Sequence, residues 1–300
     1  LLAGLDVPRQ GLVGPWSHKC PHIGEPGPAI GFLQHSLRWW DRWLKGQDNG
    51  VEDEPMLRVY LQDPTSPSTG YEVRPGRWVS EPTWPSPHIE PLHFVLCRDG
   101  LLPEALVDPP RPTVRHLQSP LTLGLFGGKW CSYAAPPDLP DDQRNEDGGA
   151  YVLDSPVLEE RLEVLGAPVL ELEVSADQPV AMIAARLSDV APDGKITRVS
   201  FGVLNLTHRD GHAHPEPLVP GQKYFIRLQL NHIGQAFDPG HRVRLALSTS
   251  YWPIAWPPPE LTTLGIHLGA SRLILPERPL RDEAPVRFEP PEGTPPTPET

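Results

Sequence analysis

The sequence has few cysteines, no C-x-x-C motif and no long apolar run. Its three cysteines, Cys20, Cys97 and Cys131, are odd in number, which argues against a disulfide framework and against a zinc knuckle. We therefore expect a reducing, cytoplasmic setting. No apolar stretch approaches the length of a membrane span, and no basic region precedes Leu1, so neither a membrane anchor nor a signal peptide is predicted.

Positive charge is also scarce. The 26 lysines and arginines are outnumbered by 38 acidic residues, and the formal net charge of -12 argues against nucleic acid and anionic membranes as partners. Hydrophobic residues make up 38% of the chain, which suffices for a core. The 41 prolines suit many short strands and irregular loops better than a helical fold.

A helix is predicted over residues 28–45. Apolar residues recur there at spacings of three and four, so they share one face: Ile30, Leu33, Leu37, Trp40 and Leu44. Gly46 is a natural stop. Such an apolar face indicates that the helix packs against something large.

From about residue 51 the hydrophobic pattern changes to period two. Apolar and polar residues alternate at 57–61, 170–174, 224–230 and 243–247, which predicts strands with one buried face. Ala-Pro-Asp-Gly at 191–194 supplies a turn, because proline fixes φ and glycine adopts positive φ. Many short strands separated by such turns predict a mainly β fold, a β-sandwich or jelly roll.

Several motifs follow one another in an order that resembles a known family. Gly-Pro-Trp-Ser-His at 14–18 resembles the segment that carries the catalytic histidine in the acyl hydrolases that include cocaine esterase and the X-Pro dipeptidyl-peptidases. Trp-Asp-Arg-Trp-Leu-Lys-Gly at 40–46 resembles the end of that family's last hydrolase-domain helix. Further matches follow in the same order, from Trp-Pro at 84–85 to segments 141–144, 153–158, 187–194 and 239–245.

The resemblance implies an architecture and a division of the chain. Residues 1–50 would be the C-terminal remnant of an α/β-hydrolase domain, with its last strand, the catalytic-histidine loop and its last helix. Residues 51–289 would form a jelly-roll, galactose-binding-like β-sandwich. Residues 290–300 form a Pro-rich tail that cannot bury a core and is predicted to be disordered.

The resemblance also implies that His18 is the catalytic histidine of a serine hydrolase, which shuttles a proton between a serine and the leaving group. Its small-molecule ester or peptide substrate would pass through an acyl-enzyme, without cofactor or metal. In α/β-hydrolases the order along the chain is serine, aspartate, histidine. The sequence has no Gly-x-Ser-x-Gly, and neither Asp6 nor Ser17 matches the family's setting. We therefore expect the nucleophile and the triad aspartate to be absent from this chain, and the chain alone to be inactive.

Weaker candidates lie elsewhere in the chain. Leu125 and Phe126, in a Gly-rich apolar segment, correspond to the place where the family's β domain faces the substrate, and core packing is the alternative. Three histidines are close in sequence, and we interpret them as solvated rather than metal-binding: His208, His212 and His214.

Two other functions compete with the hydrolase hypothesis. Trp252 and Trp256 are typical of a platform for sugar rings, which makes a non-catalytic carbohydrate-binding module the alternative. A subunit that completes a split hydrolase is the third possibility. In either hydrolase hypothesis residues 11–45 would be exposed, so we predict self-association or association with an upstream hydrolase half through them. The acyl group and the preference for ester or amide are not predicted.

Overall fold

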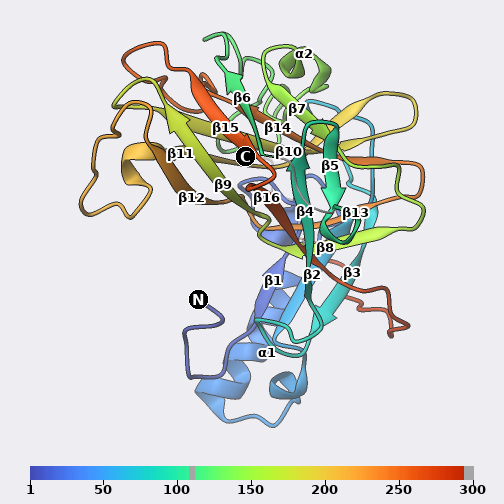
Figure 1. The fold of residues 1–300 in the computed structure, drawn as a ribbon. Helices are drawn as coiled ribbons and strands as arrows, with labels where there is room; N and C mark the ends of the chain where they lie inside the picture. The colour runs from blue at the N-terminus through green and yellow to red at the C-terminus, as the bar shows by residue number, and fades with distance from the viewer. Residues whose placement is uncertain (108–111, 294–300) are drawn as a thin grey trace, which may run out of the picture.

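The computed structural model describes residues 1–107 and 112–293, and within these ranges the strands form a twelve-stranded sheet and a four-stranded sheet. The two sheets pack face to face as a β-sandwich (Figure 1). This confirms the predicted mainly β class, whereas the jelly-roll connectivity stays a prediction. The predicted tail begins inside the described part, and residues 294–300 lie outside it.

The order of strands follows from their pairing. In the larger sheet the main path is β1-β2-β13-β8-β16-β9-β15-β6, with β3, β4, β5 and β12 attached, and the smaller sheet runs β11-β10-β14-β7. The larger sheet contains β1 (Gly11–Val13), β2 (Leu57–Gln62), β3 (Gly76–Glu81), β4 (Glu90–Cys97), β5 (Gly100–Pro103), β6 (Thr113–Leu117), β8 (Leu162–Gly166), β9 (Val169–Ala176), β12 (Lys223–Gln229), β13 (Ile233–Phe237), β15 (Leu264–Leu268) and β16 (Arg272–Glu277). The smaller sheet contains β7 (Tyr151–Asp154), β10 (Met182–Val190), β11 (Ile196–Asn205) and β14 (Arg242–Ser248).

Helices are short apart from one. The α-helices are α1 (Phe32–Lys45) and α2 (Arg144–Asp147), and the 3-10 turns are η1 (Pro21–Ile23), η2 (Val51–Asp53), η3 (Glu104–Leu106) and η4 (Leu206–His208). Within the described ranges, no helix combines the length and the apolar character that crossing a bilayer requires.

The core lies between the two sheets. On β9 the alternating Leu170, Leu172 and Val174 are buried, as the period-two pattern predicts. They meet Ile183 and Leu187 of β10 in one continuous cluster. Each such side chain contributes roughly 1.5–3 kcal/mol when it is fully buried. The sandwich is therefore stabilised by the alternation that the sequence displays.

Strand β2 departs from the predicted pattern. Arg58 and Tyr60 were expected on a solvated face, but both are buried. Arg58 Nη2 lies 3.0 Å from His35 Nε2 of α1 and 3.0 Å from Glu54 Oε2, and the Tyr60 hydroxyl donates to the Arg74 carbonyl oxygen at 2.9 Å. The prediction that this face of β2 is exposed to solvent was wrong, because α1 and neighbouring loops cover it.

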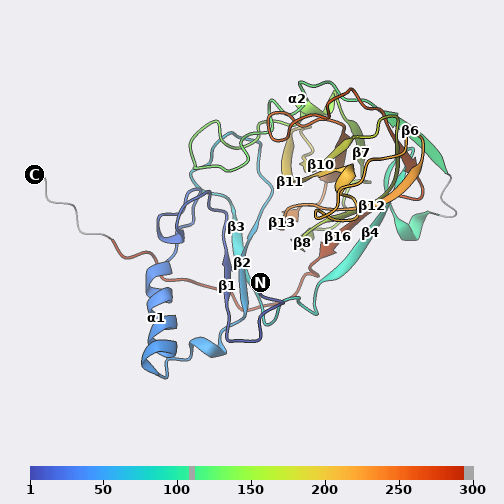
Figure 2. The same ribbon diagram turned by 90° about the vertical axis from the view of Figure 1, so that its left-hand side faces the viewer.

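Helix α1 begins four residues later than predicted. Residues 28–31 are not helical: Gly31 has a non-helical ψ of +56°, and the N–H groups of Ile30 and Gly31 donate to the Pro21 and Glu289 carbonyls. The predicted end is confirmed, since Gly46 adopts a φ of +70° and caps the helix. The helix lies at one edge of the molecule, beside β1 and β2 and apart from the sandwich (Figure 2).

The apolar stripe of α1 faces outward. Leu33, Leu37, Trp40 and Leu44 are all exposed, Leu37 to 59%. The segment after β16 returns to this helix, where Gln34 Nε2 donates to the Pro290 carbonyl at 3.0 Å. Residue 290, the first of the tail predicted to be disordered, therefore contacts α1, because its backbone carbonyl accepts this hydrogen bond.

Candidate active site

His18 lies on the loop that leaves β1. Strand β1 pairs in parallel with β2, so it extends the larger sheet and holds the start of the 14–18 segment. The backbone N–H of His18 donates to the Ser132 carbonyl oxygen at 2.8 Å. Its imidazole is exposed, and its ring centroid lies 4.9 Å from that of Tyr133 at an angle of 50°. The backbone of His18 is thus held by a loop more than one hundred residues away in the sequence, while its ring is exposed beside Tyr133.

A cavity of about 540 Å³ opens beside this histidine. One wall is the 15–18 segment, a second is the 130–132 segment, and a third is strand β11 with residues of β13. The polar side chains that line it and are buried are Ser200 and Gln235. The cavity therefore joins the His18 loop to the sandwich, and its size suits a small-molecule substrate.

Two arginines give the cavity its charge. Arg198 Nη1 donates to the Gly127 carbonyl oxygen at 2.7 Å and to the Tyr251 hydroxyl oxygen. Arg74 lies with its Cζ 4.5 Å from the centre of the Tyr71 ring. Burial lowers the pKa of Arg74, although a guanidinium stays charged at neutral pH.

The described residues contain no partner set that completes a triad with His18. Within residues 1–107 and 112–293, no carboxylate lies within ion-pair distance of its imidazole. Asp6 is exposed, and no contact joins it to the cavity. The Ser17 hydroxyl is 3.0 Å from that of Ser132, which is the loop role expected for it. Alone, His18 can accept a proton but has no activated nucleophile beside it.

Leu125 and Phe126 do not line the cavity. They are 58% and 45% exposed, and the Glu146 carboxylate accepts from the N–H groups of Gly124 and Phe126 at 2.6 Å each. These bonds tie the loop to α2. They lie outside the lining of this cavity, and their contact with a substrate stays a prediction.

The chain reaches the cavity four residues beyond Phe126. It turns at Gly128, whose φ is +69°, and there a Cβ would lie 2.7 Å from the Asp138 carbonyl oxygen. After this turn Trp130 lines the cavity, with its ring 5.8 Å from that of Phe201. Sequence reasoning missed Trp130, and the Gly-Gly pair just before it was the available signal.

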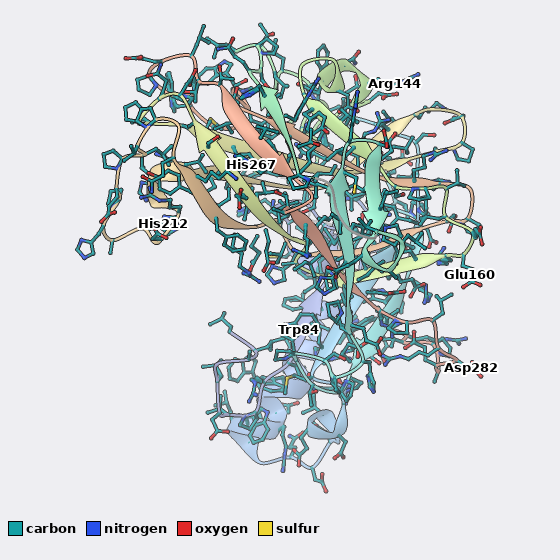
Figure 3. All side chains as sticks on the ribbon, viewed as in Figure 1. Trp84, Arg144, Glu160, His212, His267 and Asp282 are labelled. Atoms are coloured by element: carbon teal, nitrogen blue, oxygen red, sulfur yellow. The ribbon has the colours of Figure 1, made fainter. Side chains whose placement is uncertain are left out.

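The three clustered histidines lie on a separate loop. His208 and His212 have their Nδ1 atoms 3.2 Å apart, and His214 is exposed. His212 projects from the edge of the sandwich (Figure 3). In the part of the chain that the structure describes, no group of three metal-ligating side chains is close enough to hold an ion. Their solvated role stays a prediction.

The tryptophan loop after β14 forms an aromatic pair. The rings of Trp252 and Trp256 are 4.6 Å apart at an angle of 59°, and Trp256 is 81% exposed. The backbone N–H of Trp252 donates to the Leu123 carbonyl oxygen at 2.9 Å, and this bond joins the loop to the 123–127 segment. One indole therefore offers a free face, but the pair is not a flat platform.

Comparison with known proteins identifies most of the chain. Residues 49–284 match the family described as the X-Pro dipeptidyl-peptidase C-terminal non-catalytic domain. Cocaine esterase of Rhodococcus sp. is 22% identical over 261 residues, which cover 81% of this chain and 44% of that protein. The chain spans less than half the length of the curated relatives it matches.

Solved structures share the fold. An aminopeptidase from a marine sediment Thaumarchaeota archaeon superposes with a TM-score of 0.66 at 21% identity, covering 89% of this chain and 49% of that one. A CocE/NonD family hydrolase from Staphylococcus aureus gives 0.62 at 16% identity, covering 82% and 45%. The resemblance stated from the sequence is confirmed, and His18 lies before the matched range.

Proposed function

The chain belongs to the X-Pro dipeptidyl-peptidase C-terminal non-catalytic domain family, and on that premise we propose that it forms the C-terminal part of a serine hydrolase. The reaction is the cleavage of ester or amide bonds, X-Pro dipeptidyl bonds among them, through an acyl-enzyme. Residues 49–284 supply the non-catalytic β domain. The preceding loop supplies the catalytic histidine, His18, to a serine and an aspartate that lie outside these 300 residues.

One observation carries the proposal. His18 lies ahead of the non-catalytic domain, yet its loop and strand β11 of that domain line the same cavity. A histidine on a loop after a strand, with an exposed ring and an adjacent cavity, supports a role as general base. A purely structural histidine would need no such cavity beside it.

The mechanism assigns each group a role. The serine attacks the substrate carbonyl while His18 takes its proton, and His18 then donates that proton to the leaving group. The aspartate holds the other imidazole nitrogen and stabilises the imidazolium. Trp130 and β11 close one side of the acyl site and exclude water from it.

The exposed face of α1 supports a partner for this segment. Leu37, Trp40 and Leu44 form one apolar stripe on the surface, and an apolar patch of this kind marks an interface. We assign it to the hydrolase half, joined covalently or as a separate subunit. Self-association of the chain through residues 11–45 is the outcome to expect when that half is absent.

An esterase assay tests the proposal. The 300-residue chain alone should not hydrolyse a p-nitrophenyl ester, whereas the chain joined to a hydrolase segment of its family should do so. His18→Ala should abolish that turnover, and His214→Ala, at an exposed histidine on a separate loop, should retain it. Robust turnover by the chain alone, lost in His18→Ala, would reveal a nucleophile within these residues and overturn the proposal.

The exposure of Trp256 favours a second candidate, a carbohydrate-binding module without chemistry. A glycan array should then give signals that Trp256→Ala removes and His18→Ala leaves unchanged. Absence of any glycan signal, together with turnover by the joined enzyme, would reject this candidate.

A further inference from the structure

The cavity beside His18 is positively charged although the chain is acidic. Arg74 and Arg198 both line it, and no aspartate or glutamate is among its lining residues in the described ranges. The chain as a whole carries a formal charge of -12. The charged side chains that line the cavity are thus positive, whereas the chain as a whole is negative.

These two arginines also differ from three arginines of the sandwich, of which two are buried and one is half-buried. Arg186, Arg244 and Arg278 each contact a carboxylate at 3.0 Å or less. In the described part of the chain, no acidic side chain forms an ion pair with Arg74 or Arg198. A guanidinium that is partly desolvated without a counterion is costly, so an anion in this place would be stabilising.

Each arginine retains donors that no protein group uses. A guanidinium has five N–H groups, and Arg198 uses only those of Nη1, on the Gly127 carbonyl and the Tyr251 hydroxyl. Arg74 Nε is buried and has no hydrogen-bond acceptor among the described residues. The Tyr71 ring lies against the Arg74 guanidinium, with its centre 4.5 Å from Cζ.

We propose that Arg74 and Arg198 bind a carboxylate of the substrate, so that the enzyme selects esters or amides whose acyl part carries a negative charge. This rests on the proposed function, because His18 marks the reacting end of the same cavity. Guanidinium groups match carboxylates with two parallel hydrogen bonds, which gives orientation as well as attraction. The indoles of Trp16 and Trp130 line the cavity and suit the apolar chain that separates the carboxylate from the scissile carbonyl.

Binding to the 300-residue chain tests the inference without any turnover. The probes are monomethyl adipate, which carries one carboxylate, neutral dimethyl adipate, and methyl 6-aminohexanoate, a cation of similar length. Titration calorimetry should show the anion binding at least about 10-fold more tightly than either of the others. An acidic protein without a local site would prefer the cation, so a cation preference, or equal binding of all three, would overturn the inference.

Variants locate the site. Arg74→Gln should weaken binding of monomethyl adipate about 10- to 100-fold. Arg74→Lys should weaken it less, because the lysine ammonium keeps the positive charge but lacks the paired N–H donors of the guanidinium. Arg227→Gln, an exposed residue of β12 that does not line the cavity, makes the same charge change and should have no effect. Unchanged near-UV circular dichroism shows that each variant is folded. Equal losses in Arg74→Gln and Arg227→Gln would mean that only net charge matters and would reject the site.

The joined enzyme separates this inference from the proposed function. If it hydrolyses neutral p-nitrophenyl esters but the chain binds no anion, the inference fails and the hydrolase proposal stands. If the chain binds the anion through Arg74 but the joined enzyme never turns over an ester, the hydrolase proposal fails. Anion binding by the chain that is lost in the joined enzyme would mean that acids of the hydrolase segment occupy the arginines, and this also overturns the inference.

Discussion

Replacing Arg278 by methionine should destabilise the chain strongly, because this guanidinium is fully buried at the centre of a charged network. Its Nε donates to Glu81 at 2.8 Å and its Nη2 to Glu283 at 2.6 Å, while Glu163 lies 3.5 Å from Nη1. Arg278, Glu81 and Glu163 all have side chains that are 0% exposed. The network joins the end of β16 to β3 and β8.

The magnitude follows from what the substitution leaves behind. Removing one partner of a buried ion pair costs about 3–5 kcal/mol, mainly through the charge left without compensation. Here Glu81 keeps Arg281 at 2.6 Å, and Glu163 keeps both Arg77 and Arg161. The bond at 3.5 Å contributes little. We therefore expect the lower end of the range, about 3 kcal/mol, from a typical total of ~5–15 kcal/mol.

Urea unfolding measures this loss. Arg272→Met is the matched control on the same strand, because its ion pair with Glu104 is exposed and should contribute only about 0–1 kcal/mol. Adding Glu81→Gln to Arg278→Met should recover part of the stability, since a neutral amide is cheaper to bury than a carboxylate. A loss below about 1 kcal/mol, or one equal to that of Arg272→Met, would refute the reasoning.

Three further predictions concern acid, backbone and surface. Burial alone would raise the pKa of Glu163, but hydrogen bonds from Arg77 and Arg161 outweigh burial and hold this pKa below the ordinary 4.5. The ionised carboxylate therefore stabilises the fold fully above pH 4.5, and this stabilisation is lost as the pH falls through the lowered pKa of the folded state. Urea midpoints from pH 7 to 3 should show this loss, with a shallower acid decline in Glu163→Gln. Gly124→Ala should lower the free energy of unfolding by more than ~2 kcal/mol in the same assay, because φ is +115° and the added Cβ would lie 2.3 Å from the Trp252 carbonyl oxygen. Gly148→Ala is the control: its Cβ would meet nothing within 4 Å, so the free energy of unfolding should not change. Leu37→Glu should leave the unfolding free energy within ~0.5 kcal/mol but reduce association in light scattering; unchanged association would remove α1 from the interface.

Strands such as β9 and β12 were predictable because side chains alternate along them between a buried face and a more exposed one. Leu170 and Leu172 alternate with glutamates on β9, and the structure buries the apolar members. The same reasoning failed for Arg58, because a covering helix is invisible in a local pattern. It also placed the start of α1 too early, because residues 30 and 31 make contacts with Pro21 and Glu289 that a local pattern does not show, and Gly31 is not helical.

The site was predictable only in part. His18 was chosen through its motif and its order among other motifs; the structure places it at a cavity, and its catalytic role stays a prediction. Leu125 and Phe126 were chosen through the family resemblance, and the structure places them outside this cavity, on a loop that Glu146 holds from about twenty residues away. Their role stays a prediction. Arg74 and Arg198 could not be recognised, because an arginine without a counterion differs from a paired one only in three dimensions.

The most direct test of the central claim is phosphonate labelling of the joined enzyme, since a fluorophosphonate reacts only with an activated serine. The account predicts rapid labelling of a serine in the hydrolase segment that His18→Gln slows by on the order of 10³-fold or more. His214→Gln, at an exposed histidine on a separate loop, should leave the rate unchanged. Labelling that is equally fast in His18→Gln would contradict the account, and so would a label attached to the 300-residue chain itself.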